Sequence, residues 1–244
     1  MYKIFYYELQ RILFSWIFLA MLIVNGMYAW YVLTGDIIEG TACTAPFSVW
    51  SCCAYTAKLM PVTVITILLL LCGYYGRKQK QAEILISAAP VTSAQHLLIR
   101  SAVLLVCFLI LCAESAAAAV LFYSTFFAYS DYTGFLLPGL LIMFPCFLIS
   151  VAAGHLLARL HQGFAYALTG ILFTAGLLEP GYAWNLFGAG YFEAYPLTLA
   201  PGQNGEPAFS MQPQWLMARG LYVLIGAGLF LWNVRHAKRK ETKA

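Results

Sequence analysis

The sequence has few charged residues for its length. Lys, Arg, Asp and Glu make up 10% of the 244 residues, whereas hydrophobic residues make up 62% and the mean hydropathy is +0.76. Soluble domains carry about 25% charged residues, so this composition excludes an ordinary water-soluble protein.

Several catalytic sequence patterns are missing as well. No Gly-Lys dipeptide occurs, so the chain lacks a Walker A loop that could hold the phosphates of ATP. The H-E-x-x-H and G-x-S-x-G patterns of common hydrolases are also absent. We therefore expect that the chain is not an enzyme and binds no cofactor of its own.

Cysteine occurs seven times, but never at the spacing of zinc ligands. His155 and His161 have no acidic residue or cysteine close in sequence that would complete a metal site, so we predict none. Cys43, Cys52 and Cys53 fall near the predicted outer face, where an oxidising compartment would permit a disulfide. A bridged and a free Cys43 both remain possible from the sequence.

The sequence contains six long apolar runs, of which one is interrupted by Glu114. A hydrocarbon core of about 30 Å requires roughly 20 apolar residues per helix. The runs are continuously apolar rather than alternating, which favours helices over a β-barrel. The expected fold is an all-α integral membrane protein with transmembrane helices at about residues 12–34, 59–75, 97–123, 134–158, 162–178 and 215–234.

The positions of Lys and Arg predict the orientation of the chain. All fourteen except Lys58 and Arg219 fall on the same side of the six runs. Lys and Arg are retained in the cytoplasm during insertion, so we expect both termini on the cytoplasmic side of the plasma membrane. The net charge of +4 follows from this topology, and no nucleic-acid partner is expected.

Residues 1–13 form a segment of their own in the sequence. Phe5, Leu9 and Ile12 recur at helical spacing, while Glu8 and Arg11 occupy other faces. This pattern predicts an amphipathic helix at the membrane interface, followed by a single transmembrane domain at residues 14–244. The alternative is a cytoplasmic extension of the first span.

The cytoplasmic segment between the second and third spans has its own helical signals. Helix formers run over residues 77–89, and Pro90 would end the helix. Thr92 and Gln95 form a T-x-x-Q capping box that would begin the third span. A short helix across the membrane face is therefore predicted, with an ordinary connecting loop as the alternative.

Residues 179–214, before the last span, are unusually aromatic for a loop. Aromatic side chains favour the membrane interface, and irregular backbone is tolerated at membrane depth where protein buries it. We predict a half-inserted hairpin through Tyr195. The alternative is an aromatic loop that rests on the outer leaflet.

Four ionisable residues are predicted to share one layer of the membrane. Counting 1.5 Å per residue from the cytoplasmic helix ends places each of them roughly 22 to 26 Å from the inner face. We hypothesise that Lys58 and Glu114 pair there and help to close an outer gate. In the alternative, all but Glu114 extend to the outer headgroups. The candidate layer consists of Lys58, Glu114, Glu179 and Arg219.

The order of these parts resembles the permease subunit of a type-2 ATP-binding-cassette (ABC) exporter over essentially the whole chain. Such permeases begin with an amphipathic elbow helix that carries an acid and then a base, here Glu8 and Arg11. A cytoplasmic coupling helix follows the second of six spans, here in EILISAAPVTSAQHLLIR, and a long outer segment precedes the last span. The motifs are degenerate, so the resemblance depends on their order and spacing.

The resemblance implies partners and a mechanism. A cytoplasmic ABC ATPase would hydrolyse ATP with Mg²⁺, and this chain would pair in the lipid bilayer with a second copy or a related permease. ATPase closure would then drive export of an amphipathic, peptide or lipid-like substrate. The residues that would couple to the ATPase are Arg77, Lys78, Gln81, Glu83, Ser87 and Pro90.

Two other classes of protein remain as alternatives. A secondary transporter usually contains an internal repeat, and the two halves of this sequence show no convincing one. A non-transporting membrane scaffold or sensor would normally carry its signal in a soluble domain. No soluble stretch here is longer than the predicted outer segment.

Overall fold

The computed structural model describes residues 2–76, 92–178, 184–202 and 206–241. Within these ranges the chain is helical and contains no strand. The helices are α1 (Tyr2–Leu13), α2 (Trp16–Val32), η1 (Leu33–Ile37), α3 (Val49–Tyr74), α5 (Ser93–Phe127), η2 (Thr133–Phe135), α6 (Leu136–Leu160), α7 (Gln162–Leu177), α8 (Ala189–Ala194), η3 (Pro196–Thr198) and α9 (Pro213–Glu241).

Five of the described helical segments are long and apolar enough to cross a membrane. They confirm a membrane-like, all-helical fold and coincide with five of the six predicted spans. α7 has 16 residues, which corresponds to roughly 24 Å and is short of a hydrocarbon core of about 30 Å. The span predicted at residues 162–178 therefore stays a prediction.

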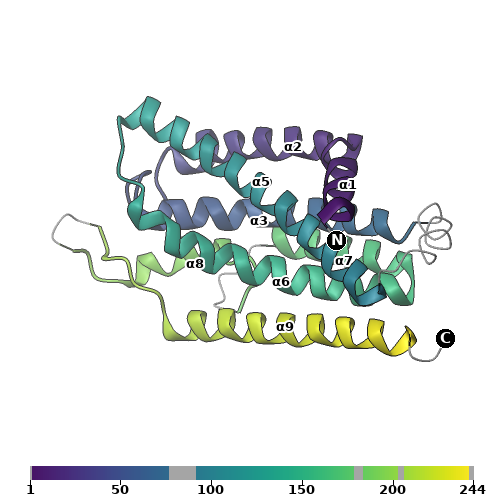
Figure 1. Cartoon of the computed structure of the whole chain (residues 1–244). Helices are drawn as coiled ribbons and strands as arrows, with labels where there is room; N and C mark the ends of the chain where they lie inside the picture. The colour runs from purple at the N-terminus through teal and green to yellow at the C-terminus, as the bar shows by residue number, and fades with distance from the viewer. Residues whose placement is uncertain (1, 77–91, 179–183, 203–205, 242–244) are drawn as a thin grey trace.

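α1 is a separate helix rather than a straight extension of α2. The backbone at Ser15 is extended, and the Ser15 hydroxyl accepts a hydrogen bond from the Phe18 amide at 3.2 Å, which caps α2. In Figure 1, α1 lies across one end of the bundle, while α2, α3, α6 and α9 run along it. Its buried residues, Glu8 and Ile12, are four positions apart and so share one face. We call this end of the bundle the α1 end.

α3 is the central helix of the bundle. It contacts α2, α5, α6, α7 and α8, and most of its side chains are buried. It begins at Val49, ten residues before the predicted start of the second span at residue 59. The prediction stopped there because Lys58 carries a charge, but in the structure this residue lies within the helix.

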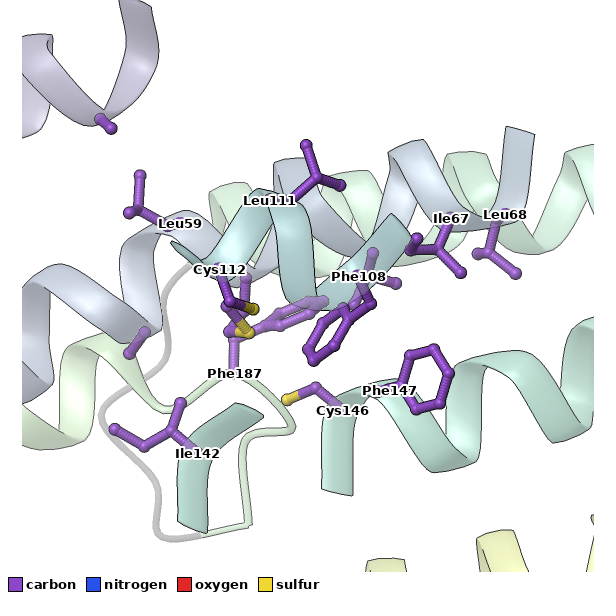
Figure 2. Packing of buried hydrophobic residues seen from close by; sticks show 14 of the residues in the cluster. Leu59, Ile67, Leu68, Phe108, Leu111, Cys112, Ile142, Cys146, Phe147 and Phe187 are labelled. Atoms are coloured by element: carbon purple, nitrogen blue, oxygen red, sulfur yellow. The ribbon is translucent and has the colours of Figure 1, made fainter. Parts of the chain in front are cut away.

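α8 lies toward the end of the bundle opposite α1, which we call the α8 end (Figure 1). Phe187 and Phe192 are 1% and 0% exposed, and Figure 2 shows Phe187 beside Cys112 of α5 and Cys146 of α6. The Leu186 carbonyl accepts a hydrogen bond from the Cys146 thiol at 3.1 Å. These residues are therefore packed inside the bundle, and the half-inserted hairpin stays a prediction. Irregular backbone is tolerated here because protein surrounds it.

Candidate functional site

The residues predicted to couple to an ATPase lie outside the described residues. The predicted capping box just after them is confirmed. The Thr92 hydroxyl accepts a hydrogen bond from the Gln95 amide at 3.3 Å, and the Gln95 side-chain oxygen accepts one from the Thr92 amide at 3.0 Å. α5 therefore begins at Ser93, directly after the predicted N-cap residue Thr92. The coupling positions outside the description are Arg77, Lys78, Gln81, Glu83, Ser87 and Pro90.

A cluster at the α1 end connects α1, α3 and α5, of which α3 and α5 flank residues 77–91 in the sequence. The guanidinium groups of Arg11 from α1 and Arg100 from α5 lie over the ring of Tyr74 from α3, at 5.5 and 5.2 Å from its centroid. Glu8, 5% exposed, forms a salt bridge of 2.6 Å with Arg11. Contact with an aromatic face stabilises a guanidinium, more strongly where water is excluded. We call Glu8, Arg11, Tyr74 and Arg100 the tyrosine-arginine cluster.

His155 lies nearby and is fully buried. Its Nδ1 is 2.9 Å from the Tyr75 hydroxyl, and its Nε2 is 3.1 Å from the Ser101 hydroxyl. Both ring nitrogens are thus engaged in linking α6 to α3 and α5. Among the described residues, no group of three or more His, Cys, Asp or Glu side chains is placed to hold a metal ion.

Lys58 forms ion pairs with two carboxylates. Its Nζ lies 2.8 Å from Oδ2 of Asp36 in η1 and 2.7 Å from Oε1 of Glu193 in α8. The predicted Lys58–Glu114 pair is therefore wrong, because the Lys58 ammonium is turned toward the α8 end and Glu114 has different partners. We call Lys58, Asp36 and Glu193 the ion-pair cluster.

Glu114 instead belongs to a cluster of neutral polar groups. Asn25, which is fully buried, donates from Nδ2 to Glu114 Oε2 at 3.0 Å and lies 3.1 Å from Ser115 Oγ. The Thr63 hydroxyl donates to Asn25 Oδ1 at 3.2 Å. Thr63 is five residues from Lys58, or roughly 7.5 Å along α3, so the ion-pair cluster lies at a different depth. We call Asn25, Thr63, Glu114 and Ser115 the polar cluster.

Arg219 anchors the inserted segment rather than pairing with an acid. It donates to the carbonyls of Asn185, at 2.9 Å, and Leu186, and its guanidinium lies 4.5 Å from the centroid of the Trp215 ring. The side chain also approaches Gly188, where a Cβ would lie 2.6 Å from an Arg219 nitrogen and where φ is +82°. Both the close approach and the positive φ favour glycine there. Glu179, the fourth residue of the predicted layer, lies outside the described residues.

The sequence analysis did not predict Asp36 and Glu193 as partners of Lys58. It also did not predict Asn25 as the partner of Glu114. Asn25 is uncharged and was passed over because the search of the spans considered ionisable groups. A neutral amide within the apolar run at residues 12–34 was nevertheless a usable signal, because a buried amide needs hydrogen-bond partners. No sequence signal would have identified Glu193. This residue lies in α8 and is brought to Lys58 by the fold of the segment that precedes α9.

A cavity of about 370 Å³ lies between α3, α5, α6 and η2. This volume is within the range of about 300 to 1,000 Å³ typical of small-molecule sites. Its wall on α5 consists largely of small residues, among them Cys112, Ala113, Ser115, Ala116 and Ala119. Runs of small residues often permit close helix packing, but here several of them line an open space instead.

All seven cysteines, Cys43 among them, are free in the structure. In comparisons with protein-family models, characterised proteins and solved structures, no family model, protein or structure matched the chain. Function therefore has to be argued from the geometry of the chain itself.

Proposed function

We propose that the chain is the transmembrane permease subunit of an ABC exporter in the plasma membrane. It would pair with a second copy or a related permease and move an amphipathic, peptide or lipid-like substrate out of the cell. ATP would be hydrolysed by a separate cytoplasmic ATPase. The all-helical, membrane-like fold and the order of its parts support this proposal.

The observation that carries the proposal is the tyrosine-arginine cluster. α3 and α5 flank residues 77–91, and α1 contacts α5 in the bundle. Before residues 77–91, Tyr74 lies two residues from the end of the described range. After them, Arg100 lies seven residues from the start of α5. Because Arg11 of α1 and Arg100 both contact Tyr74, the helix across the end of the bundle is connected to both flanks of the proposed coupling segment.

Such a connection would suit mechanical coupling. Packed helices move as rigid elements, and small shifts at an interface become larger rearrangements where two packings compete. Movement of an ATPase bound at residues 77–90 would reach α3 and α5 directly, and α1 through Arg11. At the other end, the inserted segment before α8 covers the bundle and would have to move for substrate to leave.

The polar cluster gives the secondary-transporter alternative its one supporting observation. Glu114 is an ionisable residue within a predicted span, and such residues often mark ion or proton pathways. Transport driven by an ion or proton gradient without ATP would favour that alternative over the exporter.

The test is co-purification with a candidate cytoplasmic ABC ATPase. The two proteins should co-elute from detergent, and the complex should hydrolyse ATP. Glu83→Arg and Pro90→Gly should weaken co-elution, because they alter the proposed docking segment. An ATPase that never binds the chain would refute the proposal.

A second variant tests the coupling step. Tyr74→Leu should leave co-elution intact but uncouple ATP hydrolysis from transport in proteoliposomes, because the contacts of Arg11 and Arg100 with the ring are lost. Tyr7→Leu is the matched control, since Tyr7 is an exposed residue of α1 with no aromatic or cation contact to α3 or α5 among the described residues. Equal effects of the two variants would contradict the role of the cluster.

A further inference from the structure

The cavity between α3, α5 and α6 opens on the apolar outside of the bundle. In Figure 1, α5 diverges from α6 toward the α8 end. Four exposed residues of α5 recur at intervals of four, three and four positions and therefore share one face. Exposed residues of α6 also line the cavity. The mouth is formed by Leu109, Ala113, Ala116 and Val120 of α5 and by Leu136 and Leu140 of α6.

The alanines of this face create the opening. Leu109 and Val120 are 53% and 41% exposed, and Ala113 and Ala116 between them have side chains of a single carbon. No residue that lines the cavity is charged. Glu114 is next to this face in sequence, but its carboxylate lies against Asn25 and Gly26 of α2. The cavity is therefore suited to hydrocarbon that enters from the bilayer.

Most polar groups around the cavity are already satisfied by the protein. The Tyr55 hydroxyl donates to the Ser115 carbonyl at 2.8 Å, and the Thr56 hydroxyl donates to the Cys52 carbonyl at 2.9 Å. The Tyr132 hydroxyl donates to the Tyr129 carbonyl at 2.8 Å. A bound molecule therefore does not have to accept hydrogen bonds from these hydroxyl groups.

Tyr123 is the exception. Its side chain is 0% exposed and lines the cavity, and its hydroxyl has no hydrogen-bond partner among the described residues. A buried hydroxyl without a partner costs free energy that a bound molecule could recover. The site thus combines an apolar volume with an unsatisfied hydroxyl on a side chain of its wall. This hydroxyl is closed off from the cavity in the structure, so a ligand would reach it only after a small shift of the neighbouring side chains.

We propose that this cavity binds one uncharged, single-tailed amphiphile from the membrane, with its polar group hydrogen-bonded to the Tyr123 hydroxyl. A hydroxyl or ester carbonyl of the ligand would meet Tyr123, and the hydrocarbon tail would leave through the mouth between α5 and α6. A charged headgroup is disfavoured because nothing on the lining would compensate its charge. The site belongs to this chain alone, so its test needs no ATPase and is separate from that of the proposed function.

The probe is a decanol that carries a photoreactive diazirine in its tail, added to the full chain in phosphatidylcholine nanodiscs. After illumination, mass spectrometry of peptides locates the label. Labelling should concentrate on the cavity-lining residues of α3, α5 and α6, and excess unlabelled decanol should reduce it. Labels spread evenly over the lipid-facing helices and insensitive to decanol would overturn the proposal.

Two variants test whether the cavity itself holds the probe. Ala116→Leu should lower labelling at least fivefold because the new side chain fills the mouth, a loss that corresponds to about 1 kcal/mol. Ala117→Leu is the matched control, since Ala117 is also exposed on α5 but does not line the cavity. Equal labelling of the two variants would contradict the proposed site.

The role of Tyr123 is tested with a diazirine alkane of the same length. Tyr123→Phe should lower labelling by the alcohol about fivefold, the value of one hydrogen bond, and leave labelling by the alkane unchanged. The variant should fold normally, because the hydroxyl it removes has no partner in the protein. In the unmodified chain the alcohol should also label more strongly than the alkane. Equal labelling by the two probes would show that the cavity holds bilayer hydrocarbon only.

Discussion

The ion-pair cluster and the polar cluster place ionisable groups of the same bundle in opposite surroundings. Lys58 meets two carboxylates, whose side chains are 43% and 40% exposed, close to the α8 end. Glu114 has no cationic partner within salt-bridge distance among the described residues, and its hydrogen bond comes from the amide of Asn25. One cluster thus balances charge with charge near the surface, whereas the other solvates a carboxyl group with a neutral dipole.

This difference predicts different dependence on solution conditions. Exposed or partly exposed ion pairs are screened by salt, whereas hydrogen bonds between neutral groups inside the bundle are not. Glu114 has only neutral hydrogen-bond partners among the described residues, so salt has no ion pair to screen there. The two clusters should therefore respond differently when charge is removed from each.

The largest effect is expected from Asn25→Leu. The substitution removes the donor to Glu114 and Ser115 and the acceptor for Thr63, and leaves Glu114 among apolar groups. We expect a loss of about 2 to 3 kcal/mol in the free energy of unfolding, because a partly buried polar group loses its partner. Unfolding in mixed micelles titrated with SDS, followed by circular dichroism, measures this loss.

The double variant Asn25→Leu with Glu114→Leu provides the control. It should recover much of the lost stability, because replacing both partners with apolar groups leaves no orphaned carboxyl. Additive losses in the double variant would show that Asn25 and Glu114 act independently.

Lys58→Met should have an intermediate effect that depends on salt. The Lys58 side chain is only 13% exposed, but both of its partners are well exposed, so we expect a loss of about 1 kcal/mol at low ionic strength. The loss should shrink when NaCl is raised from about 0.05 to 0.5 M, because the Debye length then shortens severalfold. SDS titrations of both proteins at each salt concentration measure the difference.

Glu114→Gln should change stability less than Lys58→Met and without salt dependence. Glutamine has nearly the same size, carries no charge and keeps a side-chain oxygen that can accept the Asn25 hydrogen bond. The same titrations provide the measurement. A large, salt-sensitive loss in Glu114→Gln would show that the carboxylate is charged and paired electrostatically, which would contradict the contrast between the two clusters.

The partners in both clusters depend on features that hydropathy does not encode. Apolar runs predicted five of the described spans, and the capping box at Thr92 predicted the start of α5, because both signals are local. The pairing of Lys58 with Glu193 is not local, since α8 reaches Lys58 only after the inserted segment has packed into the bundle.

The depth count failed for a related reason. It assumed that the helices begin at the cytoplasmic edges of the apolar runs, yet α5 begins at Ser93, four residues before the predicted edge at residue 97. It also ignored rotation about each helix axis, which turns Glu114 toward α2. Helix rotation and the path of long loops are set by tertiary packing, and that information is distributed over many residues.

The smallest effect concerns a carboxylate in water, Asp131, which is the natural reference for both clusters. It accepts hydrogen bonds from the hydroxyl and the amide of Thr133, at 2.7 and 3.2 Å. These bonds hold the pKa of Asp131 below its ordinary value, the hydroxyl contributing more. A lowered pKa in the folded state stabilises the chain above the ordinary pKa of Asp, and this contribution is lost as the pH falls through the lowered value.

Thr133→Val removes the hydroxyl donor and keeps the amide, so the pKa of Asp131 should rise part of the way toward its ordinary value. The chain contains two aspartates, Asp36 and Asp131. Selective ¹³C labelling of Asp carboxyl carbons therefore gives two NMR signals, which Asp36→Asn assigns, and one titration reports on the ion-pair cluster and on the solvent-exposed reference together. The Asp36 signal should be unaffected by Thr133→Val. A shift in both signals would mean that Asp36 and Asp131 are electrostatically coupled, so that Asp131 could not serve as an independent reference for a carboxylate in water.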